Sequence, residues 1–237
     1  MADTFLSDVH PRLDRPDRGR RLAEVVAGLG PEDTLTVAGD LCDFWFASRQ
    51  RRRADACEGL AALASYRRRG GDLTLMAGNH DRWLGPLYER VVGVGLVEEP
   101  RLVDSHGLRL SLVHGHRLGG RPAWKGAMES RAFLHVFGLA PRAAADRLDA
   151  ALETSNDRTI GESEARHWAN YRSYAEGLQG RADIAVFGHI HNPRDERDGP
   201  LRLVVLGGWQ RRTSYLRVDE RGASLHVHAL DGGAAVS

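Results

Sequence analysis

Lysine and cysteine are scarce in this chain of 237 residues. Lys125 is the only lysine, so arginine carries the positive charge, and the formal net charge is only +1. A dedicated nucleic-acid binder would show a basic excess, so we expect no nucleic-acid partner. Cys42 and Cys57 are too few for a disulfide scaffold, and no C-x-x-C pair occurs.

Long hydrophobic runs are absent as well. No apolar stretch approaches the roughly 20 residues needed to cross a bilayer, and residues 1–9 lack the basic start and long apolar centre of a secretory signal. We therefore expect a soluble, cytoplasmic protein. Peripheral contact with the cytoplasmic face of a membrane stays open at this point.

The first third of the chain alternates apolar strands with helical patterns. Residues 4–6, 35–37 and 73–76 are short apolar runs, and helical spacing of apolar residues separates them at 22–29 and 54–66. This β-α-β-α-β order predicts a sheet that is at least partly parallel, with right-handed crossovers. In such sheets, ligands bind beyond the carboxyl ends of the strands.

The rest of the chain divides into a helical stretch and further strands. Residues 108–113, 184–187, 203–206, 214–218 and 224–228 read as strands, the last three antiparallel. Residues 122–179 are rich in Ala, Arg, Leu and Glu and lack strand alternation, which predicts an inserted helical cap. The expected domains are thus a core of residues 1–121 and 180–231, a cap of 122–179, and a tail of 232–237.

Polar clusters follow five of the predicted strands. They are Ser7-Asp8-Val9-His10, Gly39-Asp40-Leu41-Cys42-Asp43, Gly78-Asn79-His80-Asp81, His114-Gly115-His116 and Gly188-His189-Ile190-His191. Carboxylate and amide oxygens with imidazole nitrogens suit a divalent cation that activates water. A single histidine of this kind is more often structural, but five clusters at strand ends together predict a two-metal site.

The spacing within these clusters suggests roles. On an extended strand, Asp8 and His10 would share one face, and His189 and His191 have the same spacing. Asp40 could bridge two ions with its two oxygens, while Asn79 offers a neutral oxygen. His80, beside a predicted ligand, is expected to contact the phosphate or protonate the leaving group, since imidazole exists in both protonation states near neutrality.

Several neighbouring residues receive supporting or structural interpretations. Asp43 and Asp81 are expected to orient the histidine ligands by hydrogen bonds, and Cys42 is expected to be buried in the core. His116 is as consistent with a ligand as with a structural residue. The histidines outside the clusters are interpreted as structural: His106, His135, His167, His226 and His228.

In this order, the five clusters resemble the five motifs of calcineurin-like metallophosphoesterases, over residues 8–191. The resemblance implies a mixed α/β (α+β) fold, a four-layered α-β-β-α sandwich with an inserted helical cap. It also implies two divalent ions, Mn²⁺ by preference and Fe²⁺, Co²⁺ or Zn²⁺ as alternatives. One ion would be held by Asp8, His10, Asp40 and His191, and the other by Asp40, Asn79, His114 and His189, with His80 as the catalytic histidine.

A narrower resemblance is to UDP-2,3-diacylglucosamine pyrophosphatases of lipid A synthesis. It rests on Gly39-Asp40-Leu41-x-Asp43-x-Trp45, on the insertion between His114 and His189, and on Leu206-Gly207-Gly208-Trp209. It implies hydrolysis of UDP-2,3-diacylglucosamine to 2,3-diacylglucosamine 1-phosphate and UMP, by attack of a metal-bound hydroxide on phosphorus. Asn79, His80, Ser155 and Arg158 would bind the substrate, and residues 133–139 would form an apolar wall for its acyl chains.

Four departures from that family leave the substrate open. His80 stands where its best-known members carry arginine, and His116 replaces an aspartate. The acidic residue expected a little further on falls near Pro122, and the cap lacks the family's lysines. One alternative is a metallophosphodiesterase or phosphatase acting on nucleotides or phosphoproteins. A non-enzyme alternative is an interaction module on the same fold.

Overall fold

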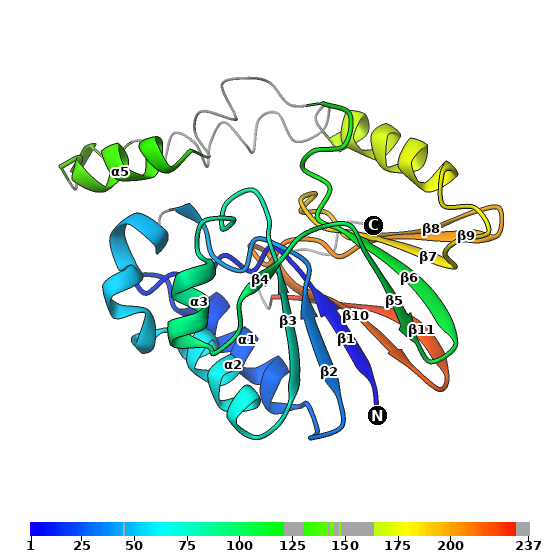
Figure 1. The fold of residues 1–237 in the computed structure, drawn as a ribbon, viewed down its shortest axis with the longest axis horizontal. Helices are drawn as coiled ribbons and strands as arrows, with labels where there is room; N and C mark the ends of the chain where they lie inside the picture. The colour runs from blue at the N-terminus through cyan, green and yellow to red at the C-terminus, as the bar shows by residue number, and fades with distance from the viewer. Residues whose placement is uncertain (45, 121–129, 142, 145–146, 148–163, 231–237) are drawn as a thin grey trace.

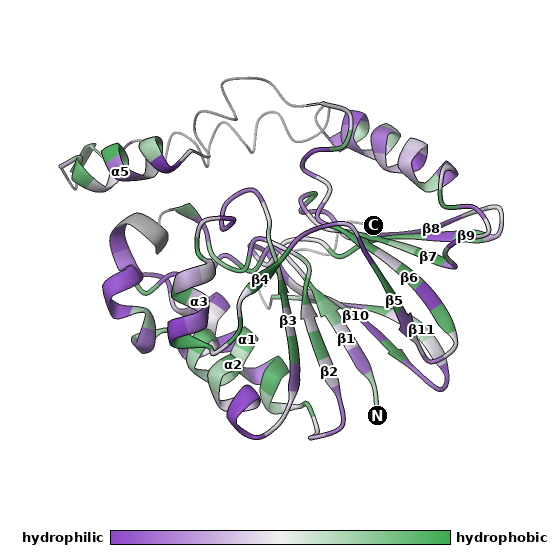
Figure 2. Ribbon diagram, viewed as in Figure 1, coloured by the Kyte–Doolittle hydropathy of each residue, from purple (hydrophilic) through white to green (hydrophobic). Residues whose placement is uncertain are grey.

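The computed structural model describes residues 1–44, 46–120, 130–141, 143–144, 147 and 164–230. Two β-sheets lie face to face, with helices on the outer side of each (Figure 1). This four-layered α/β arrangement is the predicted one. Figure 2 shows hydrophobic residues running through the strands of both sheets, whose inner faces form the central core.

The first sheet has six strands in the order β11-β10-β1-β2-β3-β4. Their bounds are β1 Asp3–Leu6, β2 Thr34–Val37, β3 Asp72–Met76, β4 Leu96–Val97, β10 Arg212–Asp219 and β11 Gly222–Ala229. Strands β1 to β4 are parallel, and β10 pairs antiparallel with both β1 and β11. The carboxyl ends of β1, β2 and β3 therefore meet at one edge, as the sequence predicts.

The second sheet has five strands in the order β5-β6-β7-β9-β8. Their bounds are β5 Arg101–Ser105, β6 Leu108–Val113, β7 Ile184–Phe187, β8 Arg194–Asp198 and β9 Leu201–Val205. Strands β6, β7 and β9 are parallel, and the edge strands β5 and β8 are antiparallel to their neighbours. The clusters that follow β6 and β7 thus lie at neighbouring strand ends.

The helices cover the outer faces of the two sheets. On the first sheet lie α1 Asp17–Ala27, α2 Glu58–Arg68 and α3 Gly85–Val91, together with a π-helical turn over Phe46–Gln50 and a 3₁₀ helix over Arg51–Ala56. On the second sheet lies a helix whose described part spans residues 164–176 and buries Trp168 and Tyr171 against β7 and β9.

Two predicted elements differ from the structure. The helix predicted over residues 54–66 begins later, at Glu58, because Cys57 is extended (φ −82°, ψ 111°) and separates α2 from the 3₁₀ helix before it. Of the three C-terminal strands predicted to be antiparallel, β10 and β11 are. The remaining one, β9, instead lies in the second sheet, parallel to β7.

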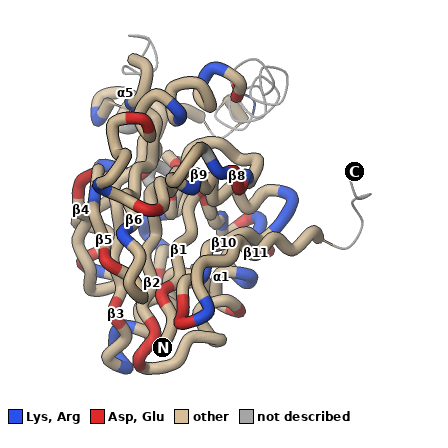
Figure 3. The backbone as a smooth tube through the Cα atoms, turned by 90° about the vertical axis from the view of Figure 1, so that its right-hand side faces the viewer, with Lys and Arg blue, Asp and Glu red and all other residues tan. Residues whose placement is uncertain are grey.

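Helix α5, Arg131–Leu139, stands apart from the two sheets (Figure 1). It begins at Ser130, whose side chain accepts a hydrogen bond from the backbone N–H of Phe133, as a helix N-cap does. Phe137 is buried, whereas Val136 and Leu139 are 66% and 74% exposed. Within the described residues, no helix is both long enough and apolar enough to span a membrane. Figure 3 shows acidic and basic residues interspersed along the side that it views.

Candidate metal centre

The candidate ligands lie in loops with an unusual backbone. Five described residues other than glycine have positive φ, and four of them are Asp8, His10, Asp40 and His189, with φ between 47° and 64°. Such conformations cost about 1–3 kcal/mol each and persist only where surrounding contacts fix them. The expectation that Asp8 and His10 meet because they share a face of an extended strand is therefore wrong. They meet because the chain turns at both residues.

Each of the two aspartates divides its oxygens between two tasks. Asp8 Oδ2 accepts a hydrogen bond from the backbone N–H of His189 (2.9 Å), and Asp40 Oδ1 accepts one from that of His80 (2.8 Å). The other oxygen of each carboxylate faces imidazole rings. The first oxygen thus fixes a neighbouring loop, and the second is directed into the site.

The first group of ligand atoms comes from Asp8, His10 and His191, gathered within 4.8 Å of one another. Asp8 Oδ1 lies 3.9 Å from His10 Nε2 and 3.7 Å from His191 Nε2. Bonds of about 2.1 Å place two ligand atoms of one ion about 3.0–4.2 Å apart, depending on the angle. Both distances from Asp8 Oδ1 fall in that range.

The second group comes from Asp40, His114 and His189, again within 4.8 Å. Asp40 Oδ2 lies 3.3 Å from His114 Nε2 and also 3.9 Å from His10 Nε2 of the first group, which is where a bridging carboxylate would stand. The Oδ1 of Asn79 lies 3.1 Å from His114 Nε2. The predicted residues are therefore brought together, and His189 and His191 fall into different groups.

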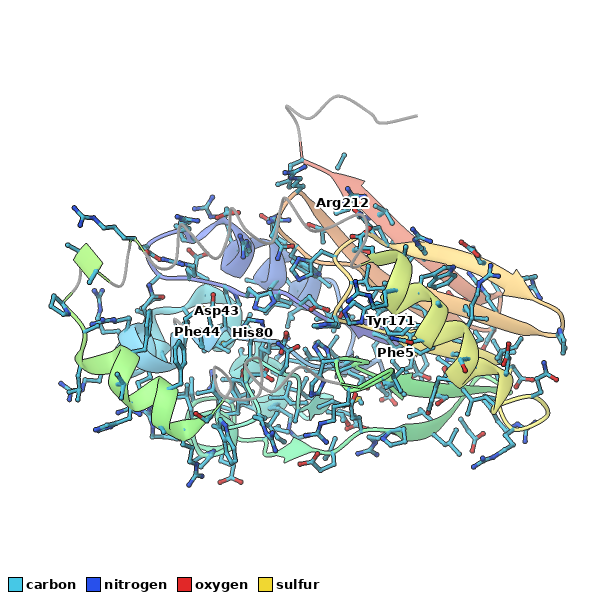
Figure 4. The ribbon with its side chains drawn as sticks, turned by 90° about the horizontal axis from the view of Figure 1, so that it is seen from above. Phe5, Asp43, Phe44, His80, Tyr171 and Arg212 are labelled. Carbon is cyan, nitrogen blue, oxygen red and sulfur yellow. The ribbon has the colours of Figure 1, made fainter. Side chains whose placement is uncertain are left out.

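His80 lies beside the second oxygen of Asp40, with its Nε2 3.9 Å from Oδ2. Its ring stacks on Phe44 at 5.9 Å between centroids and meets His10 edge-on at 5.1 Å. Figure 4 shows His80 next to Phe44 and Asp43. His80 is about one-third exposed, so it can reach a bound molecule.

Burial and charge set the protonation of the site. Burial raises the pKa of Asp8 to about 7. Burial also lowers the pKa of His10 and of His189, and that of His191 to about 4. Burial opposes protonation of His114 too, but the carboxylates of Asp40, Asp8 and Glu99 together outweigh it and raise the pKa of that histidine to about 10.

These features fit divalent ions. Asp8 Oδ1 is buried without a hydrogen-bond donor among the described residues, although it faces two imidazole nitrogens. The rings of His10, His189 and His191 are neutral at pH 7, the form that can offer a lone pair to a metal. The mixed nitrogen and oxygen set suits Mn²⁺, Fe²⁺, Co²⁺ or Zn²⁺.

Asp81 and Tyr88 hold the loops after β2 and β3 together. Asp81 Oδ1 accepts from the N–H of Gly78, and its Oδ2 accepts from the N–H of Leu41 and from the hydroxyl of Tyr88 (2.8–3.0 Å). Asp81 was expected to orient a histidine ligand, but these contacts are with the backbone of the ligand loops. Asp43 accepts from the N–H of Phe46.

Glu99 is a residue that sequence reasoning missed. Its Oε2 accepts hydrogen bonds from the backbone N–H groups of His114 (2.5 Å) and Gly115 (3.2 Å), and its Oε1 lies 3.4 Å from His116 Nδ1. His116 is buried, with its ring 5.3 Å from that of His114. Glu99 follows the two-residue strand β4, which has no recognisable pattern, so no sequence signal marked it.

A family comparison agrees with this geometry. The model of the calcineurin-like phosphoesterases matches residues 4–193. The chain belongs to this family. As a calcineurin-like phosphoesterase it is a metal-dependent hydrolase of phosphoric ester or pyrophosphate bonds, and the family implies divalent metal ions at the two groups described above.

Curated relatives of this calcineurin-like phosphoesterase cover nearly the whole chain. A UDP-2,3-diacylglucosamine hydrolase of Pseudomonas savastanoi is 28% identical over 94% of both chains. One of Hahella chejuensis is 25% identical over 95% of this chain and 96% of that one. Among solved structures, an archaeal phosphodiesterase is 14% identical with a TM-score of 0.49, covering 96% of this chain and 99% of its own.

Two predicted substrate residues, Ser155 and Arg158, lie outside the described residues and stay predictions. Cys42 is buried in the core between the first sheet and its helices, as expected. His167, interpreted from sequence as structural, lies with its ring edge-on to His189 at 4.9 Å.

Proposed function

We propose that this enzyme hydrolyses the pyrophosphate bond of UDP-2,3-diacylglucosamine to give 2,3-diacylglucosamine 1-phosphate and UMP. The relatives named for this activity match about 94% of the chain at 25–28% identity. One water molecule is consumed and one P–O bond of the pyrophosphate breaks. Both products leave as phosphate monoesters.

The observation that carries the proposal is an aromatic cluster beside the metal groups, in which Phe137 is buried and Phe44 and Phe133 are partly exposed. The rings of Phe44, Phe133 and Phe137 pack together at 5.2–6.1 Å, and Phe44 also stacks on His80. A site for a small polar phosphate ester would gain nothing from such a cluster. A lipid-linked nucleotide has both parts: a pyrophosphate for the metal groups and acyl chains that gain by burial against aromatic side chains.

The ligand roles follow the two groups of atoms. We assign one ion to Asp8, His10, Asp40 and His191, and the other to Asp40, Asn79, His114 and His189. Bound ions of this kind polarise phosphate oxygens and lower the pKa of water. Mn²⁺ is our preferred metal. Loading chelated protein with Mn²⁺, Fe²⁺, Co²⁺ or Zn²⁺ in turn, followed by metal analysis and activity, tests this choice.

The protein's own groups would orient the substrate and move a proton. We propose that Nε2 of His80 donates a proton to the departing phosphate oxygen, and that Asn79 contacts a phosphoryl oxygen. The backbone N–H of His80 is bonded to Asp40 Oδ1, so the ring is held beside the ligand that faces both groups. General acid catalysis by a positioned imidazole contributes about 10²–10⁴ in rate.

The deciding experiment compares two substrates with purified protein and Mn²⁺. Hydrolysis of UDP-2,3-diacylglucosamine at a kcat/KM well above that for bis(p-nitrophenyl) phosphate supports the proposal. Activity on bis(p-nitrophenyl) phosphate alone would indicate a phosphodiesterase or phosphatase with another natural substrate. Absence of Mn²⁺ binding at micromolar concentrations would favour the non-enzyme interaction module.

We further propose that α5 rests on the cytoplasmic face of a membrane while the lipid substrate enters. Val136 and Leu139 are the exposed apolar residues that favour this contact. Flotation with vesicles of anionic phospholipid is the test. Replacing Val136 and Leu139 with serine should abolish co-flotation and leave hydrolysis of bis(p-nitrophenyl) phosphate unchanged.

A further inference from the structure

One face of the helix over residues 164–176 is turned toward the last ligand loop. Glu164, His167 and Tyr171 are spaced by three and four residues, so they lie along one side of the helix. The loop that they face, residues 188–193, runs from β7 to β8 and contains His189 and His191.

The three side chains contact the beginning, the middle and the end of this loop. The Tyr171 hydroxyl donates to the carbonyl oxygen of Gly188 (2.9 Å) in a buried setting. The ring of His167 meets that of His189 edge-on at 4.9 Å, with 81° between the planes. The Nδ2 of Asn192 donates to both carboxylate oxygens of Glu164, at 2.8 Å each.

The loop needs such support because its backbone is strained. His189 has φ 64°, and the two histidines must point into different ligand groups although they are two residues apart. Inside the loop, the N–H of Ile190 bonds to the Gly188 oxygen (2.7 Å), and Gly188 itself is tied to Val113 through its N–H (3.2 Å). The Tyr171 hydroxyl adds a second donor to that same oxygen.

We propose that Glu164, His167 and Tyr171 are positioning residues that hold His189 and His191 in ligating geometry. This inference rests on the proposed function, because it takes both histidines as metal ligands. It assigns the helix a task beyond covering the second sheet: it holds the imidazoles of the two groups at fixed separation. Loss of a side chain that supports a metal ligand commonly lowers metal affinity about 10–100-fold.

Tyr171 and Tyr174 provide a matched pair for the test. Both rings contact Phe187, and both hydroxyls bond to the core, that of Tyr171 to Gly188 O and that of Tyr174 to Ser111 on β6. Tyr171→Phe should weaken Mn²⁺ binding about tenfold by calorimetry on chelator-treated protein. Tyr174→Phe should leave that affinity within about twofold of wild type, because its partner lies in the strand and not in the loop.

Conservative replacements at the other two positions separate positioning from packing. Glu164→Gln keeps an acceptor for Asn192 and should retain more Mn²⁺ affinity than Glu164→Ala. His167→Phe keeps an edge-on ring against His189 and should retain more than His167→Ala. Thermal unfolding of every variant shows how much of each effect is loss of fold.

The outcomes distinguish this inference from the proposed function. If wild-type protein binds two Mn²⁺ ions but Tyr171→Phe and Tyr174→Phe bind them equally well, the helix is only structural and the inference is wrong. If wild-type protein binds no Mn²⁺, the proposed function itself fails. Hydrolysis of bis(p-nitrophenyl) phosphate reports the same comparison without depending on which lipid or nucleotide is the natural substrate.

Discussion

The closest approach between two ligand loops gives the sharpest prediction. A Cβ placed on Gly78 would lie 2.1 Å from Asp40 Oδ1 and 2.4 Å from the Asp40 backbone nitrogen. Non-bonded atoms prefer about 3.5 Å or more, so Gly78→Ala must push the two loops apart by more than about 1 Å. Ligand distances at a metal tolerate only about 0.2 Å. The variant should therefore lose Mn²⁺ affinity on the order of 100-fold, since Asp40 faces both groups of ligands.

Gly85→Ala is the matched control. Gly85 is the first residue of α3, and among the described residues a Cβ there would meet nothing nearer than Leu96 Cδ1 at 3.9 Å. Both variants should show wild-type circular dichroism, with Gly78→Ala less stable by about 1–3 kcal/mol because of overpacking. Calorimetry with Mn²⁺ then measures the metal effect. If Gly78→Ala bound two ions as tightly as Gly85→Ala, the close approach would not govern the bridging carboxylate and our account of the site would be wrong.

Three further predictions concern the catalytic histidine and the metals. His80→Gln should retain Mn²⁺ affinity, because the backbone hydrogen bond to Asp40 is kept. It should lower kcat for UDP-2,3-diacylglucosamine about 100-fold or more; an unchanged kcat would exclude His80 as the general acid. Mn²⁺ affinity measured from pH 6 to 9 should rise with pH, because metal binding displaces protons from Asp8 (pKa about 7) and His114 (pKa about 10). An affinity that does not change with pH would contradict the assignment of Asp8 and His114 as ligands. Chelation should lower Tm, and Mn²⁺ at 100 times its Kd should restore about 2.7 kcal/mol per site; a constant Tm would mean that the metals do not stabilise the folded state.

Residue identity at strand ends made the centre predictable. The five polar clusters needed only the rule that parallel strands deliver their carboxyl ends to one edge, and the structure gathers Asp8, Asp40, His114 and His189 there. The core strands β1, β2, β3 and β7 were equally predictable, because each is a short apolar run in the sequence. The β-α-β-α-β order along the chain also predicted a partly parallel sheet, and β1, β2 and β3 are parallel.

Features without an apolar pattern could not be predicted. Strand β8 reads Arg-Asp-Glu-Arg-Asp, without an apolar pattern, so composition gives no strand signal. It pairs with β9 through its backbone and through a salt bridge between Asp195 and Arg202 (2.6 Å). Strand β4 has two residues. The backbone turns at Asp8 and His10 were missed because positive φ at residues other than glycine is rare and unmarked in sequence.

The remaining features that the sequence did not predict are contacts between residues far apart in the chain. These contacts also hold the strained backbone of the ligand loops in place. Glu99 binds the backbone of the His114 loop, Asp81 binds the backbone of the Asp40 loop, and Tyr171 binds the backbone of the His189 loop. In each case a side chain that is not a ligand accepts from, or donates to, the main chain of a ligand loop. Strained backbone persists only where several such contacts agree. The ligand loops are therefore fixed through their backbones, which leaves one oxygen each of Asp8 and Asp40 directed at the site.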